Sequence, residues 1–277
     1  MGFLGVRLFA PAVRLRPTEP APCSFTVLRR EAVLKSDFLS YVFSIMTAFD
    51  VNIRPFTPED MPEAIRIVRA SWAFAEMESE IGRLSTAAHY LIEALAASNI
   101  AYTAEHAGET DDSREVIGFL AGHIPGIPLK APLDSDEARS WADNIERHWQ
   151  LNTTAAERDS WASDWFEEEN ETERLARERG LMPESPSRLI LFAVSPEAKG
   201  RGTGSALYQA FDNAHRGFNA AHAQILHTDT WCNHTFYEKR GFSPLTEVPV
   251  FETEASGRSV KIGAFFLCLK PGEKSEK

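Results

Sequence analysis

The sequence of 277 residues is poor in cysteine, in long apolar runs and in basic charge, and each shortage excludes a class of protein. Its three cysteines include no Cys-x-x-Cys pair, which argues against a disulfide framework or a zinc site and favours a reducing compartment. No apolar run approaches the length of about 18 residues that a membrane-spanning helix needs. With 29 Lys and Arg against 40 Asp and Glu, the chain also lacks the basic surface of a nucleic-acid binder. We therefore expect no metal, no membrane and no nucleic acid as partners.

What the chain does contain is a glycine-rich stretch at 189–207, LILFAVSPEAKGRGTGSAL. The apolar run over 189–194 predicts a strand that is buried on both faces. Pro196 ends this run, a helical segment begins near Thr203, and three glycines lie around the junction: Gly200, Gly202 and Gly204. A strand, a glycine-rich turn and a helix N-terminus together present backbone N–H groups to a phosphate, and glycine permits close approach and positive φ.

Two common phosphate loops do not fit this stretch. A P-loop ends in Gly-Lys-Ser/Thr, whereas Lys199 precedes the glycines here. A dinucleotide loop requires Gly-x-Gly-x-x-Gly, whereas the spacing from Gly200 to Gly204 is Gly-x-Gly-x-Gly. A tight strand-to-helix turn without any ligand stays open as an alternative.

The segment VSPEAKGRGTGSAL resembles the acetyl-CoA-binding motif of the GNAT N-acetyltransferase superfamily, Gln/Arg-x-x-Gly-x-Gly/Ala after a Val-x-Pro strand end. Lys199 takes the first position of the motif in place of the commoner Gln or Arg, with Gly202 and Gly204 next and Val194 and Pro196 upstream. A second run, TDTWCNHTFYEKRGF, follows an apolar strand at 223–227 and is similar to a later family pattern. The matching residues are Asn233, Phe236, Tyr237, Glu238, Lys239, Gly241 and Phe242.

The resemblance extends over roughly 51–270 and implies the GNAT fold, which is α/β (α+β). In that fold a central mixed, mostly antiparallel sheet is flanked by helices, and its two central strands splay apart to bind acyl-CoA. Local patterns agree with it: a strand at 51–56, a helix capped by Thr57 and opened by Pro58, and a helix over 85–97. Further strands are expected at 100–105, 115–123, 248–251 and 260–267, with hairpin turns at AGETDDS and ASGR.

The remaining segments divide the chain further. Residues 1–50 form an N-terminal extension that carries five arginines against one acid in its first thirty positions. This extension is disordered or dispensable, a transit peptide, or an ordered additional element. Residues 124–186 form a helical insertion into the family pattern, and 271–277 form a polar tail.

The insertion is acidic and contains four of the six tryptophans: Trp141, Trp149, Trp161 and Trp165. Trp161 and Trp165 lie one turn apart and share a helix face. Either these aromatic side chains dock an amphipathic insertion onto the core, or they wall the acceptor pocket as a cage for an ammonium group. The insertion is also a candidate dimer contact, so a homodimer is possible.

The resemblance implies a role in coenzyme binding or catalysis for each of several individual residues. The backbone around Phe192, Ala193 and Val194 would pair with the pantetheine arm and polarise the thioester carbonyl. Tyr237 would protonate the departing thiolate, and Asn233 would contact the coenzyme arm or cap a short helix that begins near Trp231. The loop that would hold the pyrophosphate consists of Lys199, Gly200, Arg201, Gly202, Thr203, Gly204 and Ser205.

The general base stays open at this level. The strand at 189–194 carries no carboxylate, so the candidates are Glu105, His123, His227 and Asp229, or a water relay. Cys232 is not expected to act as a covalent nucleophile because no histidine dyad follows from its spacing. Cys268 is expected to be a core residue.

The sequence thus predicts an acetyltransferase that moves an acetyl group from acetyl-CoA to a primary amine, preferably a small molecule, by direct attack and without a metal. The alternative is a GNAT-fold module that binds acyl-CoA for regulation or interaction without efficient transfer. The expected location is the cytoplasm, or the mitochondrion if residues 1–50 are a transit peptide.

Overall fold

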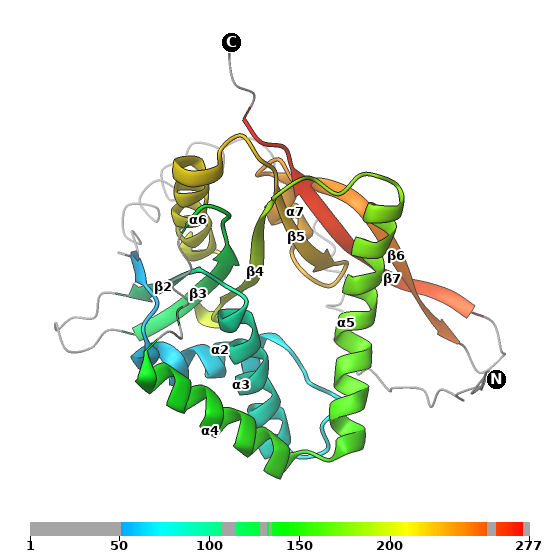
Figure 1. The fold of residues 1–277 in the computed structure, drawn as a ribbon. Helices are drawn as coiled ribbons and strands as arrows, with labels where there is room; N and C mark the ends of the chain where they lie inside the picture. The colour runs from blue at the N-terminus through cyan, green and yellow to red at the C-terminus, as the bar shows by residue number, and fades with distance from the viewer. Residues whose placement is uncertain (1–50, 107–114, 128–131, 133–134, 254–258, 274–277) are drawn as a thin grey trace, which may run out of the picture. The chain divides into compact units, whose positions relative to one another are not determined.

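The computed structural model describes residues 51–106, 115–127, 132, 135–253 and 259–273. Over these residues the chain forms a seven-stranded mixed sheet flanked by helices, in the order β1-β2-β3-β4-β5-β7-β6 (Figure 1). The predicted fold class is confirmed. The strands are β1 (Val51–Pro55), β2 (Ile100–His106), β3 (Glu115–His123), β4 (Ser187–Val194), β5 (Gln224–Asp229), β6 (Ser243–Thr253) and β7 (Ser259–Lys270). The helical segments are η1 (Pro58–Asp60), α2 (Met61–Ser71), α3 (Glu80–Ala96), α4 (Asp136–Asn152), α5 (Ala155–Glu178), η2 (Pro196–Ala198), α6 (Thr203–Asn219) and α7 (His234–Glu238).

The two central strands, β4 and β5, form the one parallel pair in this sheet, and they pair only at their beginnings. Their register runs from Ser187 opposite Gln224 to Leu189 opposite Leu226. Beyond these positions β4 continues beside β3 to Val194, while β5 continues beside β7 to Asp229. The splayed central strands are therefore present as predicted.

Helices cover both faces of the sheet (Figure 1). On one face α2 and α3 pack against β3 and β4, where Phe119 lies opposite Ala193 and both are buried. On the other face α6 places Leu207 and Phe211 over Leu120. The alternation of side chains along each strand separates these two layers of the core.

The predicted helical insertion forms α4 and α5. Helix α4 packs along α3, and α5 runs beside β6 and β7 (Figure 1). Trp149 and Trp161 are buried in the core, where Trp149 stacks on His89 at 3.6 Å between ring centroids. These two tryptophans therefore dock the insertion onto the core, which confirms the first of the two predicted alternatives for them. The prediction that they form a cage for an ammonium group is wrong, because their rings are buried in the packing of the core. The side chain of Trp165 lies outside the described residues.

The structure corrects three local predictions. Strand β4 is not buried on both faces: its residues alternate between buried and half-buried, and residues 188–192 line a cavity. The helix predicted from Ser85 begins at Glu80, where the Ser79 side chain accepts a hydrogen bond from the backbone N–H of Gly82. The short helix predicted from about Trp231 begins at His234.

Several predictions concern residues outside the described ranges: the extension 1–50, the AGETDDS and ASGR turns, and positions 274–277 of the tail. Whether the chain resides in the cytoplasm or the mitochondrion stays a prediction for the same reason. No helix in the described part of the chain is both long and apolar enough to cross a membrane.

Candidate active site

The divergence of β4 and β5 leaves a cavity of about 360 Å³ between them. After Leu189, no strand of the described residues pairs with the edge of β4 that faces β5. That edge consequently offers backbone N–H and C=O groups to a ligand, as an exposed strand edge does. The side chains that line the cavity include Tyr90 from α3, Glu169 and Glu173 from α5, His123 from β3, Phe192 from β4, His227 and Asp229 from β5, Tyr237 from α7, and Phe265 from β7.

The glycine loop connects the end of β4 to α6. Gly200 and Gly202 have φ values of +77° and +89°, a region that other residues rarely adopt, and Gly202 is the N-cap of α6. A Cβ atom added to either glycine would meet no atom within 4 Å, so the backbone here is open to a ligand. Lys199 and Arg201 are exposed on the same loop.

Thr203 gives a second indication of an anion site at this loop. Its side chain is fully buried, and its Oγ1 has no hydrogen-bond partner among the described residues. It lies at the first position of α6, where the backbone N–H groups also have no partner within the helix. The residues present therefore fit the pyrophosphate of a coenzyme.

An aromatic cluster joins the loop to the cavity. The ring centroid of Phe192 lies 5.5 Å from that of Phe236 and 6.5 Å from that of Tyr237. A Cβ on Gly204 would make ordinary van der Waals contact with the Phe192 ring at 3.4 Å and with the Phe236 ring at 3.5 Å, so both rings lie against the start of α6. Arg240 covers Phe236 at 3.4 Å from the ring centroid and donates a hydrogen bond to Ser205 Oγ at 2.7 Å.

Two of the predicted site residues belong to the lining of the cavity, and the others do not. Phe192 and Tyr237 line it, and Val194 and the loop 199–205 follow where β4 ends. Ala193 is buried in the core beneath α2 and α3 and does not belong to the cavity lining. Asn233 is the exposed N-cap residue of α7, and its side chain makes no capping hydrogen bond.

The lining of the cavity includes three carboxylates, those of Glu169, Glu173 and Asp229. Burial, together with the negative charges of Glu173, Glu168 and Asp229, raises the pKa of Glu169 to about 7. Burial lowers the pKa of His227 to about 4, so this imidazole is neutral at pH 7. Burial and the nearby cysteine thiols and Asp229 also raise the pKa of Tyr237, whose hydroxyl therefore keeps its proton.

Of the four residues predicted as candidates for the general base, three line the cavity and one does not. Glu105 is buried away from the cavity, where it accepts hydrogen bonds from Asn52 and Arg54, and it is excluded. His123, His227 and Asp229 do line the cavity. The Oδ1 atom of Asp229 already accepts two backbone N–H groups at 2.7 Å, from Trp231 and Cys232.

Two cavity carboxylates, Glu169 and Glu173, did not appear among the sequence candidates. They lie four residues apart in the acidic run FEEENETER of the insertion and therefore share one helix face. This spacing of four residues was the sequence feature from which a pair of carboxylates on one helix face could have been predicted. Cys232 also lines the cavity, but burial and the charge of Asp229 raise the pKa of its thiol to about 12, which does not suit a nucleophile.

Comparison with known proteins supports the assignment of this region. Residues 166–244, from α5 to the start of β6, match the family model of the acetyltransferase (GNAT) domain. The resemblance to the GNAT superfamily is thereby confirmed for the segment that holds the glycine loop, both central strands and α7. No curated protein matches the sequence.

Solved structures with a similar arrangement include three named acetyltransferases. The histone acetyltransferase HPA2 and related acetyltransferase from Corynebacterium glutamicum is 14% identical with a TM-score of 0.48, over 82% of this chain and 99% of the other. NAA60 from Arabidopsis thaliana, in complex with a bisubstrate analogue, is 13% identical with a TM-score of 0.42, over 80% and 99%. A mosquito arylalkylamine N-acetyltransferase like 5b is 15% identical with a TM-score of 0.40, over 80% and 99%. From likenesses of this size we draw no functional conclusion.

Proposed function

We propose that this protein transfers an acetyl group from acetyl-CoA to the nitrogen of a small primary amine, by direct attack of the amine on the thioester. The observation that carries the proposal is the parting of β4 and β5 after Leu189 and Leu226. It opens a cavity lined by Phe192 and Tyr237 and by the carboxylates of Glu169, Glu173 and Asp229, and the glycine loop follows beyond the end of β4. We assign the donor to the glycine loop and the free edge of β4, and the acceptor to the part of the cavity that the carboxylates line.

The donor end is assigned to the loop and to the free edge of β4. Backbone N–H groups of the loop, with Lys199 and Arg201, would hold the pyrophosphate of the coenzyme. The unpaired edge of β4 around Phe192 and Val194 would pair with the pantetheine arm, as an added strand does. Acetyl-CoA supplies an activated acyl carbon, and the protein supplies orientation and hydrogen-bond donors to the thioester oxygen.

Tyr237 is assigned the role of acid. It lines the cavity beside Phe192, and its raised pKa keeps the hydroxyl protonated at neutral pH. A protonated phenol next to the scissile bond can deliver a proton to the sulfur as the C–S bond breaks. Thiolate departure then needs no metal.

The acceptor end favours a cationic, compact substrate. Glu169, Glu173 and Asp229 line it. Because Arg177 and Arg188 compensate the charge of Glu173, Asp229 and the ionised form of Glu169 are the groups that would attract an ammonium group and disfavour anionic acceptors. A volume of about 360 Å³ fits a small ligand, and α5 of the insertion walls it on one side.

Two measurements test the proposal. Calorimetric titration of acetyl-CoA into the full-length protein should give a micromolar Kd. Thiol release should then depend on amine, with 2-phenylethylamine, 1,4-diaminobutane and lysine amide as small acceptors and a peptide with a free N-terminal alanine as the protein-like one. Binding without release from any acceptor would favour a regulatory acyl-CoA-binding module instead. Absence of binding would remove the glycine loop as a coenzyme site.

A further inference from the structure

Helix α5 places two carboxylates on the cavity wall, and only one of them is neutralised. Glu173 accepts hydrogen bonds from Arg188 and from Arg177, so its charge is compensated on both oxygens. Glu169, one turn earlier, has no lysine or arginine within ion-pair distance in the described part of the chain. The two carboxylates therefore differ in charge compensation although they share a helix face.

The nearest titratable partner of Glu169 is His227 on β5. The Nδ1 atom of His227 lies 3.8 Å from Glu169 Oε2, and its Nε2 lies 3.9 Å from Glu173 Oε1. That Nε2 is buried and has no hydrogen-bond partner among the described residues. Because burial keeps this imidazole neutral at pH 7, it cannot compensate the charge of Glu169.

Glu169 is enclosed and yet reachable. A third of its side-chain surface remains accessible, and the residue lines the same cavity as Tyr237. Charged and titratable side chains from several elements line the cavity with Glu169: Glu173 on α5, Tyr90 on α3, His123 on β3, Arg188 on β4, His227 and Asp229 on β5, Cys232 after β5, and Tyr237 on α7. The neighbouring Glu168 on α5 adds a further negative charge. With Arg188 occupied by Glu173, their combined field disfavours an ionised Glu169 and favours its uptake of a proton.

We propose that Glu169 is the general base of the reaction, which takes the proton from the incoming ammonium group of the acceptor. This role rests on the proposed function. It supplies the carboxylate base that the strand at 189–194 does not contain. It assigns this group to the inserted helix α5, whereas the donor site and Tyr237 belong to the segment from β4 to α7.

The proton balance closes with two residues. The carboxylate of Glu169 removes one proton from the ammonium, and the nitrogen lone pair then forms the C–N bond as the C–S bond breaks. Tyr237 donates its hydroxyl proton to the departing thiolate, and the phenolate regains a proton from the newly formed amide nitrogen, which loses its second proton. Glu169 returns its proton to solvent, so the net products are the amide, the free thiol and one released proton.

The test compares Glu169→Gln with Glu167→Gln, a matched change at an exposed position two residues earlier on the same helix. Thiol release is measured from pH 5.5 to 9 with the fastest of the three small amines. For wild-type protein and Glu167→Gln we expect kcat/KM to fall as the pH drops below about 7. For Glu169→Gln we expect a loss of roughly 10²- to 10³-fold in kcat, no such fall with pH, and an unchanged acetyl-CoA Kd.

Two further measurements separate a base from a structural residue. Hydroxylamine is largely neutral at pH 7, so Glu169→Gln should impair its acetylation far less than that of an aliphatic ammonium. The ¹³C signal of the Glu169 carboxyl, identified by its absence from Glu169→Gln, should titrate near pH 7. A titration near pH 4, or an equal loss with both nucleophiles, would overturn the role.

The role and the proposed function fail in different ways. If wild-type protein releases no thiol with any amine, the proposed function is overturned and the role of Glu169 falls with it. If wild-type protein is active and Glu169→Gln keeps both its rate and its pH profile, only the role is overturned.

Discussion

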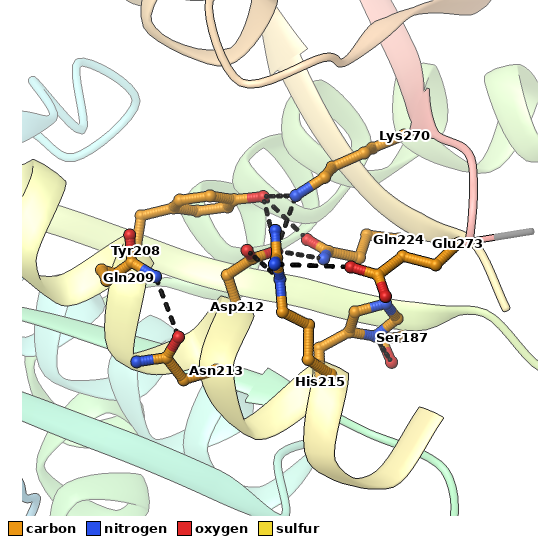
Figure 2. Close-up of polar contacts among 10 residues, drawn as sticks. Ser187, Tyr208, Gln209, Asp212, Asn213, His215, Gln224, Lys270 and Glu273 are labelled. Atoms are coloured by element: carbon orange, nitrogen blue, oxygen red, sulfur yellow. Dashed lines mark hydrogen bonds and ion pairs between the residues drawn. The ribbon is translucent and has the colours of Figure 1, made fainter. Parts of the chain in front are cut away.

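The Nζ atom of Lys270, at the end of β7, lies 2.6 Å from Oδ1 of Asp212, in the middle of α6 (Figure 2). The same carboxylate accepts hydrogen bonds from Gln224 Nε2 at 2.6 Å and from Arg216 Nε at 3.0 Å. Asp212 is nearly buried, with 6% of its side chain exposed. It therefore ties α6, which carries the glycine loop at its N-terminus, to both β5 and β7.

Replacement of Lys270 by Met should destabilise the protein. Asp212 would stay buried without its cationic partner on β7, while Arg216 and Gln224 would remain. Breaking a buried pair costs about 3–5 kcal/mol, and the two remaining partners reduce the expected loss to about 2 kcal/mol. Urea unfolding at pH 7 measures this loss as a lower midpoint with an unchanged slope.

The control for this change is Lys261→Met, which removes an ion pair with Glu247 in which both side chains are about half exposed. An exposed pair contributes about 0–1 kcal/mol, so little loss is expected. Burial acts to raise the pKa of Asp212, but bonds from Lys270 and Gln224 outweigh it and lower the pKa. The stabilisation is therefore present above the unfolded pKa of about 3.9 and is lost as the pH falls further. Equal losses for the two variants would contradict the prediction.

Glu169→Gln should make the protein more stable at pH 8 and leave its stability nearly unchanged at pH 4. The pKa of Glu169 is raised to about 7 in the folded state, so the folded chain binds more protons than the unfolded chain between about pH 4.5 and 7. Stability consequently decreases as the pH rises through that interval, and the neutral glutamine removes this decrease. Thermal unfolding of both proteins at the two pH values measures it, and a stabilisation confined to pH 4 would show that the sign is wrong.

Gly202→Val should abolish measurable acetyl-CoA binding. Gly202 has a φ of +89°, and a β-branched residue there costs on the order of 1–3 kcal/mol in backbone strain or forces the loop to change conformation. The matched control is Gly217→Ala, which lies within α6 and would meet no atom within 4 Å. This change should leave binding intact and slightly stabilise the helix. Calorimetry distinguishes the two variants, and normal binding by Gly202→Val would remove the loop from the donor site.

Tyr237→Phe should lower turnover and leave the acetyl-CoA Kd unchanged. The ring keeps its packing against Phe192 and Phe242, whereas the hydroxyl that would protonate the thiolate is lost. General acid catalysis contributes about 10²- to 10⁴-fold, so a loss in kcat of about 10²-fold is expected. Phe236→Leu, which alters the neighbouring aromatic ring and retains Tyr237, tests whether packing alone explains the effect. A wild-type rate for Tyr237→Phe would exclude Tyr237 as the proton donor.

Local sequence was sufficient to predict the elements that carry the proposed donor site. The apolar run of β4, the positive φ of Gly200 and Gly202, and the start of α6 at Thr203 all follow from short-range rules of chain conformation. Tyr237 was predicted differently, from the resemblance of the run TDTWCNHTFYEKRGF to a family pattern, and its role in the reaction stays a prediction.

The acceptor end was decided by tertiary structure. Glu169 and His227 are 58 residues apart, and they meet only because α5 packs beside β6 and β7 and turns one of its faces to the cavity. The sequence pattern of α5 places its acids and tryptophans on helix faces but does not fix which face meets the cavity, so Trp161 proved to be core while Glu169 lines the site. The sequence alone thus determined the segments whose function depends on backbone conformation. Helix packing determined which side chains share the site, since it sums many weak contacts between distant segments.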